Sequence, residues 1–220
     1  MERLEDLAID GYKIYQDDEL YTFTSDAVLL SRFATVKKND NVADLCSGCG
    51  IVGIHLYALN PSVSSVTLFE MQKELFDLSV KSIKYNSLDN VISAENVKVQ
   101  DIPSSFYGKF SLAVCNPPYM KSGSGENDKR HSVAVCRREI TLTLAELCEK
   151  VGKLVKFGGR FCMVHRADRL CDVITEMRKN GIEPKRLQFV RAGKKEPYLL
   201  LIEGVKGGKS GIKIYNETNN

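Results

Sequence analysis

Residues 44–53 read Asp-Leu-Cys-Ser-Gly-Cys-Gly-Ile-Val-Gly, and this stretch contains the spacing Gly-x-Gly-x-x-Gly. It lies between an apolar run at 41–46, which predicts a strand, and residues 51–59, which predict a short helix that Asn60-Pro61 ends. Glycines at such a junction permit a tight turn and let the backbone approach a ligand closely. The stretch therefore predicts the ligand-binding turn of an α/β fold, without choosing the ligand.

The rest of the chain continues this alternation of strand and helix. We expect further strands at 66–69, 97–99, 110–115, 160–164, 186–190 and 198–203. We expect further helices at about 75–86, 137–156 (ended by Gly158-Gly159) and 168–179, and a mobile loop at 121–131. The predicted fold is α/β and Rossmann-like: a seven-stranded, mostly parallel sheet with one antiparallel edge strand and helices on both faces.

Length and composition favour one domain. The 220 residues, 43% of them hydrophobic, suit a single compact α/β domain, with an N-terminal segment at 1–40, a Rossmann-like core at 41–204 and a basic flexible tail at 205–220. No run of about 18 apolar residues predicts a membrane span, and the acidic N-terminus does not resemble a signal peptide, so we expect a cytoplasmic protein. A net charge of +3 permits an anionic partner. The oligomeric state is not determined, and a monomer is compatible with the sequence.

Seven scattered cysteines do not suggest a disulfide framework. Cys46 and Cys49 form an isolated Cys-x-x-Cys, but a zinc site needs two more ligands at suitable spacing. A redox pair is an alternative, although the surrounding glycines explain the loop better. His55 and His165 have no partners at metal spacing and are interpreted as structural. We expect no metal site.

The glycine turn alone fits NAD, FAD and S-adenosylmethionine equally, and two acidic residues near it distinguish among these ligands. Asp44 precedes the turn, where it would repel a pyrophosphate but favour a cationic amine, and S-adenosylmethionine has such an amine and no phosphate. Glu70 follows the next predicted strand and can accept hydrogen bonds from both ribose hydroxyls, with Met71 on the adenine face. Asp101, beside Ile102, is positioned to accept from the adenine amino group. The alternatives are a helix N-terminal acid at Glu70 and an ordinary loop aspartate at Asp101.

The sequence Asn116-Pro117-Pro118-Tyr119 follows a predicted strand, so it lies at the carboxyl end of the sheet, where α/β folds bind ligands. An adenine amine is a poor nucleophile because its lone pair is delocalised into the ring. The Asn116 side-chain oxygen and the Pro117 carbonyl can hold its two hydrogens, and paired prolines preorganise them. Tyr119 offers a flat face on which an extruded base can stack. A proline-stiffened turn is the less specific alternative.

These residues resemble the class I methyltransferases of the Asn-Pro-Pro-Tyr type. Residues 44–50 resemble their first motif and 116–119 their fourth. The segments 16–34, 138–139 and 204–213, the last containing Lys-Gly-Gly-Lys, resemble the family of valine-tRNA adenine-N6 methyltransferases. The resemblance implies methyl transfer from S-adenosylmethionine to the adenine beside the anticodon of a valine tRNA, with residues 116–119 holding that adenine.

The resemblance and the reasoning above together predict two sets of binding residues. The expected cofactor contacts are Asp26, Asp44, Cys46, Gly48, Gly50, Glu70, Met71, Asp101, Ile102 and Asn116, with Asp26 near the methionine end unless it is a helix N-terminal acid. The expected RNA contacts are Lys121, Lys129, Arg130, Arg138, Lys206 and Lys209. Solubilising surface charge is the alternative for the second set, and Arg138 can equally pair with an acid.

Several other functions fit parts of the pattern. Protein glutamine methyltransferases face the same lone-pair problem but usually carry an additional N-terminal helical domain. DNA adenine methyltransferases and ribosomal guanine-N2 methyltransferases would have the same fold. This chain has no evident separate DNA-recognition domain, and the guanine-N2 enzymes tend to have phenylalanine where Tyr119 stands. A non-catalytic S-adenosylmethionine- or RNA-binding module and an NAD oxidoreductase are the alternatives from other classes.

Overall fold

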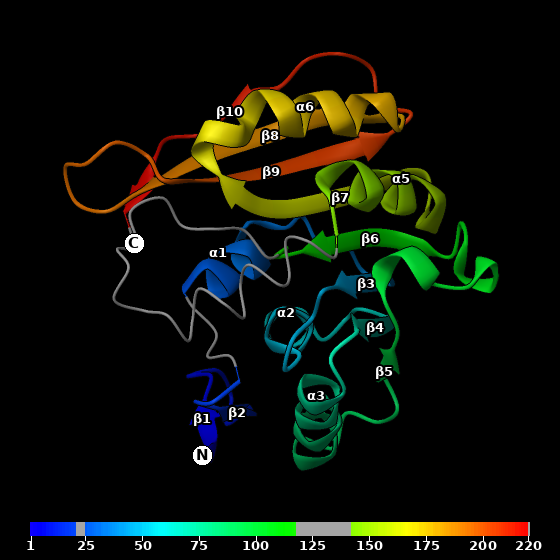
Figure 1. Cartoon of the computed structure of the whole chain (residues 1–220), viewed down its shortest axis with the longest axis vertical. Helices are drawn as coiled ribbons and strands as arrows, with labels where there is room; N and C mark the ends of the chain where they lie inside the picture. The colour runs from blue at the N-terminus through cyan, green and yellow to red at the C-terminus, as the bar shows by residue number, and fades with distance from the viewer. Residues whose placement is uncertain (21–24, 118–141, 220) are drawn as a thin grey trace.

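The glycine turn follows an interior strand of the main sheet, which has helices on both faces (Figure 1). The computed structural model describes residues 1–20, 25–117 and 142–219. Its strands are β1 (Glu2–Asp6), β2 (Lys13–Asp17), β3 (Asn41–Leu45), β4 (Ser65–Glu70), β5 (Ile92–Asn96), β6 (Phe110–Cys115), β7 (Val155–Arg166), β8 (Ile182–Arg191), β9 (Leu199–Lys206), β10 (Lys213–Ile214) and β11 (Thr218–Asn219). Its helices are α1 (Ser25–Phe33), α2 (Ile51–Leu59), α3 (Lys73–Tyr85), α5 (Leu144–Leu154) and α6 (Leu170–Lys179).

The main sheet has nine strands in the order β10-β8-β9-β7-β6-β3-β4-β5, and β11 also pairs with β8. The pairs among β3 to β7 are parallel, so these strands all end at one end of the sheet, here named the carboxyl end. The Rossmann-like α/β class predicted from sequence is confirmed. The predicted antiparallel edge strand is corrected, because antiparallel β9 lies between β7 and β8, and the sheet continues beyond β8.

Side chains alternate between the two faces of the sheet, which accounts for both helical layers. Val42, Leu112 and Val114 pack with α1, α2 and α3 in one core cluster. The intervening Ala43 and Ala113 pack with α5 and α6 in a second cluster on the opposite face. A parallel sheet covered on both faces buries nearly every strand residue, which explains why the central strands are continuous apolar runs.

Several element boundaries differ from the sequence prediction, and three of the differences are the most informative. The strand expected at 97–99 is instead Ile92–Asn96, whose polar residues suit an edge strand with one side in solvent, and 99–101 form a 3₁₀ turn. The helix expected at 137–156 ends at Leu154, and its expected start lies outside the described residues. Gly158, with φ of 73°, lies within β7 near an irregularity in the β6–β7 register rather than after a helix.

The two ends of the described chain pack against different elements, the N-terminal hairpin against helix α3 and the C-terminal tail against strand β8. The β1–β2 hairpin lies against α3, where the Tyr15 amide donates to Ser82 Oγ at 2.9 Å and the Lys13 amide donates to Asn86 Oδ1 at 3.0 Å. The tail was expected to be flexible, but β10 and β11 pair with β8, so its residues lie along the sheet edge. Within the described part of the chain, no helix is long and apolar enough to cross a membrane.

Candidate active site

The turn after β3 requires glycine at two positions for different reasons. Gly50 precedes α2 with φ of 90°, and a Cβ there would lie 2.9 Å from Leu68 Cδ1. Gly53 lies in the first turn of α2, and its Cβ would lie only 2.4 Å from Leu68 Cδ2. The first glycine permits the left-handed backbone, and the second lets the helix approach β4 closely. Together they place the start of α2 at the carboxyl end of the sheet.

Asp44 is fully buried beneath this turn. Its Oδ2 accepts a hydrogen bond from the Gly53 amide at 2.8 Å, whereas Oδ1 has no partner among the described residues. Burial raises the pKa of Asp44 to about 8, while the Gly53 amide lowers it and the nearby Glu70 adds to the rise. A buried carboxylate oxygen without a partner is unfavourable. The site is therefore suited to a cationic or hydrogen-bond-donating group.

Glu70 forms the second carboxylate of the site and is held across the glycine turn. Its Oε2 accepts from the Gly48 amide and its Oε1 from the Gln72 amide, both at 2.8 Å, and the residue is only 5% exposed. Each carboxylate oxygen can accept a further hydrogen bond. This geometry suits two adjacent hydroxyl donors, and Met71, 39% exposed, lies next to it in the chain.

Asn116 and Pro117 reach the same end of the sheet. Leu45 of β3 pairs with Cys115 of β6, so Asn116 follows β6 at the level where Cys46 follows β3. A hydrogen bond between the Cys46 and Cys115 thiols joins the two strand ends. The structure thus brings Asn116 together with the residues of the glycine turn and the carboxylates of Asp44 and Glu70.

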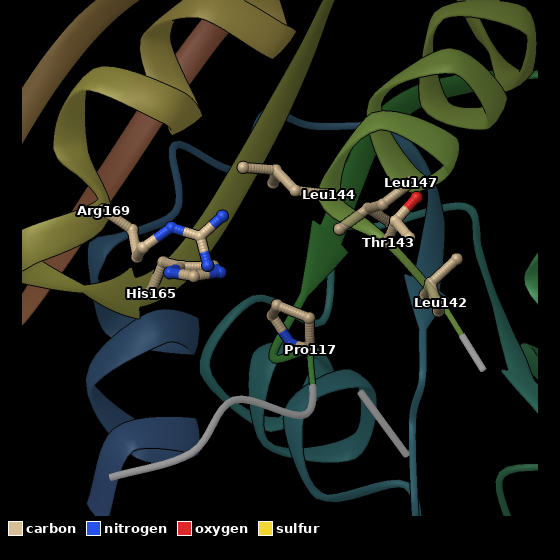
Figure 2. A pocket seen from close by; sticks show the side chains of 7 residues that line it. All are labelled: Pro117, Leu142, Thr143, Leu144, Leu147, His165 and Arg169. Carbon is tan, nitrogen blue, oxygen red and sulfur yellow. The ribbon is translucent and has the colours of Figure 1, made fainter. Parts of the chain in front are cut away.

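Pro117 also lines a pocket of about 260 Å³ (Figure 2). Leucines at and just before the start of α5 form its apolar wall, and His165 and Arg169 project from the end of β7 and the segment that follows. Thr143 fixes the position of α5 through a capping box: its hydroxyl accepts from the Glu146 amide at 3.2 Å, and its own amide donates to Glu146 Oε2 at 2.7 Å. The residues that line the pocket are Pro117, Leu142, Thr143, Leu144, Leu147, His165 and Arg169.

His165 is a neutral residue of this pocket. Burial lowers its pKa to about 4, and the positive charge of Arg169 adds to the effect. Its Nδ1 accepts a hydrogen bond from the Arg166 amide at 2.9 Å. The neutral ring therefore carries its proton on Nε2, and the pocket combines an apolar wall, a neutral imidazole and one guanidinium.

The other predicted cofactor contacts, Asp26, Asp101 and Ile102, differ in how deeply they are buried. Asp26 is buried in the first turn of α1. Asp101 is exposed at the end of its 3₁₀ turn. Ile102 is buried in the second core cluster, and its carbonyl accepts from Lys150 Nζ at 3.2 Å. The Ile102 side chain therefore contributes to the core of the protein.

The structure does not bring the predicted RNA contacts Lys206 and Lys209 to this site. They lie at and beyond the end of β9, and because β9 is antiparallel, that end is the amino end of the sheet, opposite Pro117. Lys206 Nζ donates to the carbonyls of Gly152 and Val155 at 2.6 and 2.8 Å, so it fastens the junction of α5 and β7. Six other predicted residues lie outside the described residues: Pro118, Tyr119, Lys121, Lys129, Arg130 and Arg138.

Sequence reasoning missed three residues of the pocket, namely Thr143, His165 and Arg169. His165 was interpreted as structural because it has no partners at metal spacing, and in the part of the chain that the structure describes no group of three or more His, Cys, Asp or Glu is arranged to hold a metal ion. Arg169 carries no local signal, since its approach to His165 depends on the turn after β7. Only the capping pattern Thr-x-x-Glu at 143–146 was visible in the sequence.

Two relatives of this chain have the same name. A relative in a Flavobacteriaceae bacterium (strain 3519-10), named tRNA1(Val) (adenine(37)-N6)-methyltransferase, is 24% identical over 190 residues, which are 80% of this chain and 79% of the relative. A relative of the same name in Histophilus somni (strain 129Pt) is 24% identical over 208 residues, which are 85% of this chain and 83% of the relative.

Solved structures and a family model give the broader relationship. The fold is similar to that of an O-methyltransferase, itself assigned by prediction, from Agrobacterium tumefaciens, with a TM-score of 0.69 at 16% identity over 88% of this chain and 86% of that one. It is also similar to P. horikoshii TYW2 in complex with MeSAdo, with a TM-score of 0.66 at 14% identity over 94% of this chain and 72% of that one. The model of the methyltransferase small domain matches residues 23–171, which include the glycine turn, both carboxylates and Asn116. The chain belongs to the methyltransferase small domain family.

Proposed function

We propose that this protein transfers a methyl group from S-adenosylmethionine to the exocyclic N6 amine of an adenine in tRNA. The observation that carries the proposal is the position of Asn116 and Pro117 after β6, which pairs with the strand that holds the buried Asp44 and is two strands away from the buried Glu70 at the end of β4. The names of the relatives support the adenine beside the anticodon of a valine tRNA as the acceptor. We also propose that residues 1–220 work as one domain, since the β1–β2 hairpin packs on α3 and the tail pairs with β8.

The residues of the glycine turn fit S-adenosylmethionine, which when bound supplies an activated methyl group on a sulfonium. The unpartnered Oδ1 of Asp44 provides negative charge for a cationic ligand. Glu70, already fixed by the Gly48 and Gln72 amides, would accept the ribose hydroxyls. Cys46, Gly48 and Gly50 would contact the ligand through the turn, and Asp26, Met71, Asp101 and the Ile102 backbone complete the proposed contacts.

Asn116 and the residues after it would hold the adenine that receives the methyl group. The Asn116 side-chain oxygen and the Pro117 carbonyl would accept the two hydrogens of the adenine amine, which frees the nitrogen lone pair for attack on the methyl carbon. The bound cofactor would supply the methyl carbon, whose bond to sulfur would be exchanged for a bond to this nitrogen, and the amine would then lose one proton to water. Fixed acceptors need little rearrangement, and alignment of the two reactants supplies much of the remaining rate. Pro118 and Tyr119, in the residues outside the described part, would complete the base contact.

The test is methyl transfer from labelled S-adenosylmethionine to an unmodified valine tRNA transcript, followed by nucleoside mass analysis. We expect N6-methyladenosine beside the anticodon. The matched control is the same transcript with inosine at that position, which replaces the amine with an oxygen and leaves the rest of the RNA unchanged. Methylation of both transcripts at other nucleotides would refute the proposed acceptor. Cofactor binding without transfer to any tRNA would redirect the search to ribosomal RNA, DNA and protein glutamine.

A further inference from the structure

The charges of this protein are divided between the two flanks of the main sheet. Residues 1–20 contain seven Asp or Glu and two Lys or Arg, and they form the hairpin on α3. Residues 182–219 contain four Asp or Glu and eight Lys or Arg, and they form β8, β9 and the tail (Figure 1). A polyanion near the sheet is therefore repelled on the first flank and attracted on the second.

The connection between β8 and β9 brings part of this positive charge to the carboxyl end. Residues 192–198 join the end of β8 to the start of β9, and the start of β9 pairs with the end of β7, where Arg166 is opposite Leu199. In Figure 1 this connection lies on the side toward which the arrowheads of β3 and β6 point. The Ala167 amide donates to the Tyr198 carbonyl at 3.1 Å. Since Ala167 lies between His165 and Arg169, the connection is fastened to the wall of the pocket.

Two lysines of this connection differ from the other cations at the same end. Arg166 pairs with Asp168 and Arg191 with Glu217, and Arg169 Nε donates to Asp172 Oδ2 at 2.6 Å. Lys194 and Lys195 are exposed and form no ion pair with any residue that the structure describes. Glu196 follows them, so residues 192–198 keep a net charge of +1 with both ammonium groups in solvent. Their charge is thus available to a partner that the folded chain itself does not provide.

We infer that Lys194 and Lys195 bind RNA phosphates, and that Arg169, whose Nε bonds to Asp172, meets the phosphate nearest the acceptor nucleotide in the pocket beside Pro117 through its terminal guanidinium nitrogens. The inference rests on the proposed function, and it replaces Lys206 and Lys209 as the expected contacts. The RNA strand would pass from the pocket across the β8–β9 connection and away from the acidic hairpin. Phosphate contacts of this kind set affinity and register, while the base contacts at Asn116 set the acceptor.

The test compares two charge reversals of equal size. The variant K194E/K195E changes the proposed surface, and the control K109E/K156E changes two exposed lysines at the amino end, beside the starts of β6 and β7. The affinity of each full-length protein for the valine tRNA transcript is measured at several salt concentrations, together with its affinity for S-adenosylhomocysteine.

We expect K194E/K195E to weaken tRNA binding by about 10-fold or more, and to lower the salt-dependence slope by about two, one per lost phosphate contact. The control variant should stay within about two-fold of the unaltered protein, and both variants should bind S-adenosylhomocysteine normally. An equal loss in the two variants, or no loss in either, overturns the inference. Methyl transfer by the unaltered protein separates the two proposals: absent transfer with intact, salt-dependent tRNA binding refutes the proposed reaction but leaves the binding surface supported, and absent tRNA binding refutes both.

Discussion

The glycine turn after β3 and the pocket beside Pro117 lie at the same end of one sheet, but they are built from opposite charges. The first contains two buried carboxylates: both oxygens of Glu70 and Oδ2 of Asp44 accept backbone hydrogen bonds, whereas Asp44 Oδ1 has no partner among the described residues. The second has leucine walls, a neutral histidine and an arginine. A buried carboxylate favours a cationic ligand and disfavours a polyanion. Under the proposed function, the contrast teaches how one end of a sheet can offer separate regions to a cationic cofactor and an anionic RNA.

Asn116 lies between the two regions, and its loss should have the largest effect. We expect Asn116→Ala to lower kcat by about 10²- to 10³-fold, the usual result of removing one preorganised hydrogen-bonding group, with cofactor affinity retained. Single-turnover methyl transfer and calorimetric titration of S-adenosylhomocysteine measure the two quantities. Asn116→Asp keeps an acceptor oxygen and should lose less activity. Equal losses in the two variants would point to a structural role.

Glu70 tests the carboxylate side of the comparison. Glu70→Gln keeps the size of the side chain but removes its charge, and we expect the Kd for S-adenosylmethionine to rise about 10- to 100-fold, as for hydrogen bonds to charged groups. The Kd for tRNA should not change. The control is Glu74→Gln in the first turn of α3, an exposed acid away from the glycine turn. If Glu74→Gln weakened the cofactor as much, general charge rather than the Glu70 geometry would account for the result.

The buried carboxyl group of Asp44 should make the stability of the protein depend on pH. Because the pKa of Asp44 is raised from 3.8 to about 8 by burial, its contribution favours the folded state fully below pH 3.8 and is lost as the pH rises toward 8. Between pH 7 and 8, the ligand-free protein should lose stability on the order of 1 kcal/mol, or about 2–4 °C in Tm. Asp44→Asn should remove this slope, and S-adenosylmethionine should release a proton as it binds.

The pH window of that measurement is set by the two buried histidines. Burial lowers the pKa of both His55 and His165 to about 4, so their contributions change below their ordinary 6.5 and in the opposite direction. Thermal melts of the unaltered protein and of Asp44→Asn between pH 7 and 8.5 therefore isolate the carboxylate. Parallel melting curves for the two proteins would contradict an unusually basic Asp44.

Arg169 gives the smallest expected effect and tests the cationic side. We expect Arg169→Gln to raise the KM for tRNA by about 5-fold, consistent with the loss of one phosphate contact worth about 1 kcal/mol, with no change in cofactor Kd. Arg178→Gln removes an equally charged, exposed residue from the opposite end of α6 and is the matched control. An Arg169 variant with weakened cofactor binding and normal tRNA kinetics would reverse the assignment of the two regions.

The sequence was sufficient for the turn and its neighbours because each of those residues lies near the carboxyl end of a parallel strand. Asp44 is the last residue but one of β3, Glu70 ends β4 and Asn116 follows β6, and parallel strands bring these ends to the same end of the sheet. The hydrophobic alternation likewise determined the α/β class, since both faces of a parallel sheet must be covered. Local spacing was therefore enough to predict which of these residues meet.

Only the tertiary structure decided which basic residues share that end. Lys206 and Lys209 follow a strand as Asn116 does, yet antiparallel β9 carries them to the amino end, and its start brings Lys194 and Lys195 toward Pro117 instead. Arg169 meets His165 because a 3₁₀ turn follows β7, and the tail lies on β8 through two short pairings. Strand direction and edge pairing depend on backbone hydrogen bonds between distant segments, which are not encoded in the residues on either side of a turn.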